Sequence, residues 1–136
     1  MELTPYLSFN GQCAAAFKFY EKAFNGKIVF IMTYGESPMA EQVPADWRDR
    51  VMHVSLKVEN AMLQAADAPP DRETKTTGFC VNIRVEDSEQ AERVFDALAE
   101  GGTVQMPLQQ TFWTVRFGML TDQFGIPWML NCEKAP

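Results

Sequence analysis

The side chain best suited to acid-base chemistry in this 136-residue chain is its single histidine, His53. Imidazole is the one side chain whose ordinary pKa lies near neutrality. His53 lies in a strand-like segment, residues 51–58, and Asp67 ends the next, residues 61–67. In a hairpin that turns between these segments, the residue numbers of two opposite residues add up to about 119. His53 is therefore expected roughly opposite Ala66 and near Asp67. Two hypotheses stay open: a histidine hydrogen-bonded into a strand end, or a His53–Asp67 pair that orients a ligand or acts as a base.

Three cysteines, Cys13, Cys80 and Cys132, are the other reactive side chains. They are far apart, odd in number and form no C-x-x-C pair, so neither a disulfide framework nor a zinc knuckle is indicated. We expect reduced, mostly buried thiols. Cys13 opens a helix, whose dipole is expected to lower its pKa slightly, but no acidic or histidine partner stands beside it in the sequence.

The elements that must position these side chains come in a repeated order. Apolar periodicity and turn residues predict a β-α-β-β-β unit, and then a second one. The first consists of a strand at 3–9, a helix ended by Asn25-Gly26, and strands at 27–34, 51–58 and 61–67. The second consists of a strand at 79–85, a helix at 88–100 capped by Asp87, a strand at 103–110 and a terminal strand pair. Corresponding helix motifs, A-x-x-F-Y at 16–20 and A-x-x-V-F at 91–95, indicate an internal duplication.

The terminal strand pair is joined by the sequence TDQFG, residues 121–125. Asp122 is expected to accept hydrogen bonds from its own turn, and Gly125 to take a positive φ.

Composition limits the function classes. The net charge of -6 and the pI near 4.7 oppose binding to nucleic acid or to an anionic membrane, and the 12 Lys and Arg are scattered. No apolar stretch approaches the roughly 18 residues of a spanning helix, and the first residues lack a secretory pattern. We therefore expect a cytoplasmic protein with one domain, residues 1–136, made of two modules at about 1–68 and 78–133.

Several motifs accompany this order. The chain opens with P-Y-L-x-F-x-G at 5–11, has a helix carrying Phe19-Tyr20, and closes with F-W at 112–113 and T-D-x-F-G-x-P-W at 121–128. With His53 and Asp67, these motifs resemble the PhnB-like branch of the glyoxalase/bleomycin-resistance/extradiol-dioxygenase superfamily, also called vicinal oxygen chelate. The resemblance covers essentially the whole chain. It implies an α+β fold in which tandem βαβββ modules form a curved, cup-shaped mixed sheet with helices on the outer face, assembled as a homodimer.

In metal-dependent members of that superfamily, four side chains, usually His, Gln or Glu, hold a divalent ion. The matching places here fall near Pro5, Gln64, Phe79 and Met129. Only Gln64 offers a suitable donor, and one neutral amide cannot hold a catalytic ion. The resemblance therefore implies that the standard metal site is absent, and we expect neither a metal nor another cofactor.

The same resemblance implies a ligand site on the inner face of the sheet. Alternation puts Phe79, Val81, Ile83 and Val85 on one side of their strand, and the resemblance places that side inside the cup. Trp47 lies in a long connection, residues 35–50, and is expected to cap the cup or contact a second subunit. The residues expected to bind the ligand are Tyr6, Trp47, Phe79, Trp113 and Trp128.

Two functions from different classes remain. One is a metal-independent protein that binds an apolar or aromatic small molecule in the cup. The alternative is a metal-dependent lyase, isomerase or dioxygenase-like enzyme with a non-standard site around His53, Asp67 and Glu41. Relatives of this branch are sometimes labelled methyltransferases, but none of the eight glycines forms the glycine-rich strand-to-helix turn of an adenosyl-cofactor site, so that reading is rejected. No phosphate cradle is evident either.

Overall fold

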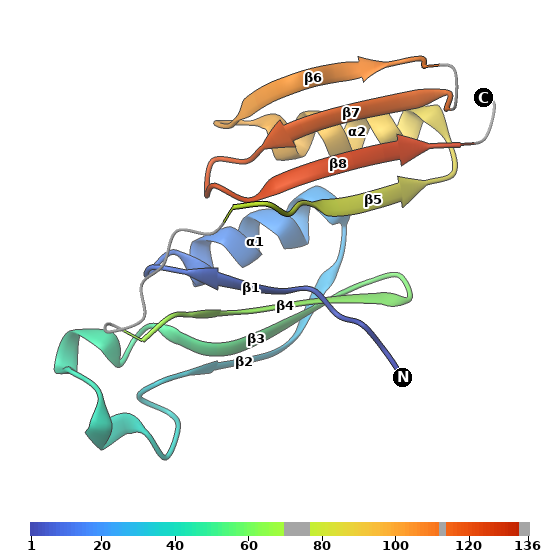
Figure 1. Cartoon of the computed structure of the whole chain (residues 1–136). Coiled ribbons are helices and arrows are strands. Elements are labelled where there is room, and N and C mark those ends of the chain that lie inside the picture. The colour runs from blue at the N-terminus through green and yellow to red at the C-terminus, as the bar shows by residue number, and fades with distance from the viewer. Residues whose placement is uncertain (70–76, 112–113, 134–136) are drawn as a thin grey trace. The chain divides into compact units, whose positions relative to one another are not determined.

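The computed structural model describes residues 1–69, 77–111 and 114–133, and the chain divides into two compact units, residues 1–75 and 76–136. Each unit is one helix packed on a four-stranded mixed sheet (Figure 1). The predicted α+β class and the β-α-β-β-β order of both halves are confirmed. In the described part of the chain, no helix is long and apolar enough to cross a membrane.

Unit 1 has the strand order β1-β4-β3-β2, with β1 parallel to β4 and the other neighbours antiparallel. Its elements are β1 (Tyr6–Phe9), α1 (Cys13–Phe24), β2 (Lys27–Thr33), the short 3-10 helices η1 (Ala40–Gln42) and η2 (Ala45–Trp47), β3 (Val51–Val58) and β4 (Ala61–Asp67).

Unit 2 repeats this topology with the order β5-β8-β7-β6. Its elements are β5 (Val81–Val85), α2 (Ser88–Ala99), β6 (Thr103–Gln109), β7 (Arg116–Thr121) and β8 (Pro127–Cys132).

Helix α1 ends where the sequence predicts. Asn25 adopts the left-handed conformation with φ 53°, and the Gly26 and Asn25 amides donate to the carbonyls of Glu21 and Lys22. This is the Schellman arrangement, which satisfies carbonyls that the last turn would leave free. The buried side of the helix faces the sheet, where Val54 and Leu56 of β3 are also fully buried.

Helix α2 begins and packs through equally local features. The carboxylate of Asp87 accepts a hydrogen bond from the Gln90 amide at 2.7 Å, as an N-cap should. On the sheet below, a Cβ at Gly118 would lie 2.7 Å from the ring of Phe95. Glycine at this point of β7 therefore lets the helix approach the sheet closely.

The predicted turn at the end of unit 2 is also confirmed. Asp122 accepts hydrogen bonds from the Phe124 and Ile126 amides at 2.8 and 3.1 Å, and Gly125 has φ 88°. The second oxygen of Asp122 accepts from the indole nitrogen of Trp128 at 2.8 Å. A single buried carboxylate thus fixes both the turn and the first aromatic residue of β8.

Asp67 has a corresponding role in unit 1 and is 1% exposed. One carboxylate oxygen accepts from the Gly11 and Cys13 amides at 2.7 and 3.1 Å, and the other accepts from the Val51 amide at 2.9 Å. Its own carbonyl accepts from the Tyr34 hydroxyl at 2.8 Å. The end of β4 therefore holds the start of α1, the start of β3 and the end of the β2 segment together.

The thiol of Cys13 is buried near this carboxylate. Burial, and then the nearby charge of Asp67, raise the pKa of the Cys13 thiol well above its ordinary value. The expected acidification by the helix dipole is wrong, because the thiol is buried and the charge of the nearby Asp67 opposes a thiolate.

The side of β5 expected to line the cup instead faces α2. Val81, Ile83 and Val85 are in register with Trp128, Leu130 and Cys132, and Leu130 is in turn opposite Gly118, which contacts Phe95 of α2. Register partners share a face of the sheet. The apolar side of β5 is therefore core, and the prediction that it is the inner, ligand-facing side is wrong.

The long connection at residues 34–50 folds back on its own unit. Trp47 is buried, with its ring edge-on to Tyr34 at 5.7 Å and the guanidinium of Arg50 4.1 Å from its centroid. Backbone hydrogen bonds from Tyr34 to Arg50 and from Gly35 to Arg48 close the connection at its base. The expectation that Trp47 caps a ligand or meets a partner is therefore wrong.

We expect Asp67→Ala to lower the free energy of unfolding by about 3–5 kcal/mol, because three amides, two of them buried, lose their acceptor. Asp67→Asn, which keeps one acceptor oxygen, should lose less. The matched control is Asp96→Ala on the exposed side of α2, which should change stability by less than about 0.5 kcal/mol. Urea unfolding measures all three, and similar losses at positions 67 and 96 would refute the structural role of Asp67.

We expect one thiol of the native protein to react readily with Ellman's reagent at neutral pH. Cys80 is partly exposed, whereas Cys13 and Cys132 are buried, and the raised pKa of Cys13 leaves little thiolate to attack. All three should react in denaturant, and Cys80→Ser should remove the fast reaction. A rapid native reaction that survives in Cys80→Ser would contradict this assignment.

Candidate functional site

The candidate site is the face of the unit 1 sheet opposite α1, where polar and aromatic side chains gather. Along β3 and β4, one alternation parity is buried toward the helix, while His53, Ser55 and Gln64 lie on the other. Tyr6 of β1 is in register with Gln64, and Phe30 of β2 is in register with Ser55. We call this surface, formed by Tyr6, Phe30, His53, Ser55 and Gln64, the open face.

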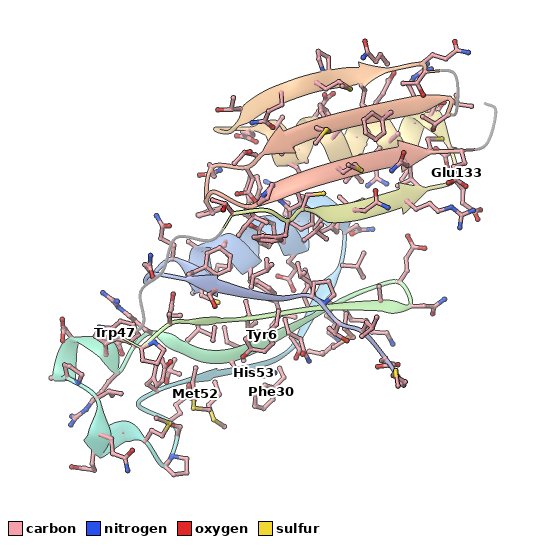
Figure 2. All side chains as sticks on the ribbon, viewed as in Figure 1. Tyr6, Phe30, Trp47, Met52, His53 and Glu133 are labelled. Carbon is pink, nitrogen blue, oxygen red and sulfur yellow. The ribbon has the colours of Figure 1, made fainter. Side chains whose placement is uncertain are left out.

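Two aromatic rings flank the histidine on the open face (Figure 2). The ring of Tyr6 on β1 lies 5.6 Å from the imidazole of His53, and the ring of Phe30 on β2, the strand next to β3, lies 5.8 Å from it. Tyr6 is 51% exposed and Phe30 46% exposed. Two large rings therefore remain available to solvent beside the only imidazole of the chain.

Hydrogen bonds connect the polar members in one line. The Tyr6 hydroxyl is 3.0 Å from His53 Nδ1, and His53 Nε2 is 3.1 Å from Ser55 Oγ. Gln64 Nε2 donates to the same Ser55 oxygen at 3.1 Å. Burial, followed by the charge of Cys13, raises the pKa of the Tyr6 phenol, so the hydroxyl keeps its proton at neutral pH.

His53 and Asp67 do not form the predicted pair. The expected hairpin register is confirmed, since Ser55 pairs with Gln64 and Val54 with Ala65. Asp67, however, lies on the helix side of β4 with its oxygens taken by three amides, whereas His53 lies on the open face. Neighbouring residues of a strand point to opposite faces of the sheet. Asp67 directly follows Ala66, the residue expected opposite His53, so Asp67 points to the other face.

The structure also corrects the positions matched to a metal site. On unit 1, the first-strand residue in register with Gln64 is Tyr6 and not Pro5. On unit 2, the residue in register with Met129 is Asn82 and not Phe79. On unit 1 this pair offers a phenol and an amide, and on unit 2 an amide and a thioether, so neither pair supplies the imidazole and carboxylate ligands of the metal-dependent relatives. Within the described ranges, no three His, Cys, Asp or Glu side chains are grouped to hold an ion.

The other three aromatic residues predicted to bind a ligand have three different outcomes. Trp128 is buried and bonded to Asp122, so it belongs to the core of unit 2 and the prediction for it is wrong. Phe79 precedes β5 and is exposed, and its role stays a prediction. Trp113 lies outside the described residues.

Phe30, Ser55 and Gln64 were not predicted as ligand-site residues. Ser55 and Gln64 follow from the hairpin register, because they share the parity of His53. Phe30 does not, since the pairing of β2 shifts between Ile28 and Phe30. A β-bulge changes which side chains share a face, and alternation alone does not reveal it.

Comparisons with known proteins agree with this fold. The sequence model of the Glyoxalase/Bleomycin resistance protein/Dioxygenase superfamily matches residues 3–130. Protein YjdN of Escherichia coli (strain K12) is 32% identical, with 98% of this chain and 97% of that protein covered.

Two solved structures are similar over almost their whole length. Protein PA1353 from Pseudomonas aeruginosa is 43% identical with a TM-score of 0.91, covering 99% of both chains. A PhnB protein from Bacillus cereus, described as a putative 3-demethylubiquinone-9 3-methyltransferase, is 26% identical with a TM-score of 0.81, covering 99% of this chain and 100% of that one.

With its two β-α-β-β-β units and this match over nearly all its residues, the chain belongs to the glyoxalase/bleomycin resistance protein/dioxygenase superfamily and has PhnB-like structural relatives.

Proposed function

We propose that the protein binds a small planar apolar or aromatic compound on the open face, without a metal ion. The observation that carries this proposal is the exposure of Tyr6 and Phe30 on either side of His53. Exposed rings on one sheet face supply a large apolar contact area at a small cost in side-chain entropy. The polar line from Tyr6 to Gln64 adds the few directed contacts that orient a ligand.

The donor set supports a metal-independent site. Tyr6 and Gln64 are a register pair of the first and last strands of unit 1, and Asn82 and Met129 are such a pair of unit 2; the resemblance implies the metal ligands of relatives on these strands. A neutral phenol, two amides and a thioether provide no anionic oxygen or imidazole for a divalent ion.

The alternative function, a metal-dependent enzyme with a site around His53 and Asp67, is weakened by the position of Asp67. Asp67 is buried on the other face of the sheet and already accepts three hydrogen bonds, which leaves it no part in acid-base chemistry beside His53. A divalent-ion-dependent activity that is lost in His53→Ala would still favour that alternative over the binding proposal.

A methyltransferase activity is not part of the proposal. Both helix starts that could cradle a phosphate or a nucleotide already hold a carboxylate of this chain, Asp67 at α1 and Asp87 at α2. The Bacillus cereus relative is described as a putative methyltransferase, but neither helix start of this chain is free to bind the phosphate or nucleotide part of a cofactor.

The proposal further includes a homodimer in the cytoplasm. Both features come from the resemblance and from the composition, and size-exclusion chromatography with light scattering measures the subunit number.

The proposal predicts saturable binding of naphthol, a flat aromatic probe, by isothermal titration calorimetry. Tyr6→Ala and Phe30→Ala should each weaken binding by about 2- to 12-fold, because each removes one ring contact. The control is Val104→Ala, which truncates an exposed apolar side chain on unit 2 and should leave the affinity unchanged. Chelator should have no effect.

Equal affinities in the two ring variants and in the wild type would contradict the open face as the binding site. A requirement for added divalent ion would contradict the metal-independent reading.

A further inference from the structure

The open face holds one buried hydroxyl whose hydrogen bonds can be assigned completely. Ser55 is 5% exposed, and among the described residues its hydroxyl has two partners, Gln64 Nε2 and His53 Nε2, each at 3.1 Å. An amide nitrogen only donates, so the Ser55 oxygen accepts from Gln64. The single proton of the hydroxyl must then find its acceptor on His53.

This requirement selects the tautomer of the imidazole. If His53 Nε2 carried a proton, two donors would point at the Ser55 oxygen and the buried Ser55 proton would have no acceptor, which is unfavourable. Nε2 therefore accepts from Ser55, and the neutral ring carries its proton on Nδ1. Nδ1 then donates to the Tyr6 oxygen, 3.0 Å away.

The line thus has a direction, from Gln64 through Ser55 and His53 to Tyr6. The Tyr6 oxygen is the acceptor of the His53 proton, so its own hydroxyl hydrogen has no acceptor in the described part of the chain. Tyr6 is half exposed, so this hydrogen is the end of the line that faces solvent.

We infer that the compound bound on the open face carries a hydrogen-bond acceptor, a carbonyl or carboxylate oxygen on a planar ring system, which accepts from the Tyr6 hydroxyl. This inference rests on the proposed function, and it names the chemical class of the ligand. A planar compound that can only donate hydrogen bonds could not accept from the Tyr6 hydroxyl and would lose this hydrogen bond.

The direction of the line can be measured without any ligand. The chain has one histidine, so nitrogen NMR of isotope-labelled protein at about pH 8.5, above the ordinary imidazole pKa, reports the tautomer of His53 alone. We expect the Nδ1–H tautomer. In Gln64→Glu the new carboxylate only accepts, so Ser55 turns its proton to residue 64 and the tautomer should change to Nε2–H.

The matched control is Gln105→Glu on unit 2, where the glutamine donates to Thr121 instead. This variant should leave the His53 tautomer unchanged. An Nε2–H tautomer in the wild type, or a tautomer that Gln64→Glu does not change, would overturn the inferred direction.

The ligand class is tested with three bicyclic probes of similar size: indanone, which accepts a hydrogen bond, indole, which donates one, and indane, which does neither. Calorimetry should give about 2- to 12-fold tighter binding for indanone than for indane or indole. In Tyr6→Phe the preference for indanone should disappear.

The outcomes separate this inference from the proposed function. Equal binding of the three probes, weakened by Phe30→Ala, would overturn the acceptor inference and support the proposed function. Binding of none of them, and none of naphthol, would overturn both.

Discussion

The carboxylate of Asp67 is the interaction on which the rest of unit 1 depends. Besides β4 itself, three parts of the chain meet at this residue: the β1–α1 turn through Gly11 and Cys13, the start of β3 through Val51, and the end of the β2 segment through Tyr34. The Cys13 and Val51 amides would otherwise be buried without an acceptor. Because β3 is fixed two residues before His53, the position of the imidazole on the open face follows from this buried contact.

Strand alternation then separates structural from functional side chains. Asp67, Leu63 and Ala65 of β4 face α1, whereas Gln64 on the same strand faces the other way with His53 and Ser55 of β3. A residue that completes the core is thus a neighbour in sequence of one that lies on the open face. The two aspartates of the family motif both act as acceptors for backbone amides, Asp67 for amides of distant segments and Asp122 for amides of its own turn.

The sequence allowed the order of elements, both helix starts and stops, and the β3–β4 register to be predicted, because each depends on local turn chemistry and alternation. It did not reveal which face of a strand meets a helix, so Val81 and Ile83 were assigned to the wrong side. The roles of Asp67, Trp47 and Trp128 depend on hydrogen bonds and ring contacts between segments distant in sequence or on local packing that periodicity does not encode. Phe30 was missed because the bulge in β2 changes its face.

The central claim is that the open face binds an organic compound without a metal ion. The most direct measurement is a native mass spectrum of the protein purified without chelator and without added metal, since one spectrum reports subunit number, bound ions and copurified compounds. We expect a dimer that carries a small organic adduct, lost in Phe30→Ala, and no stoichiometric metal. A stoichiometric divalent ion, retained in Phe30→Ala and lost in His53→Ala, would contradict it.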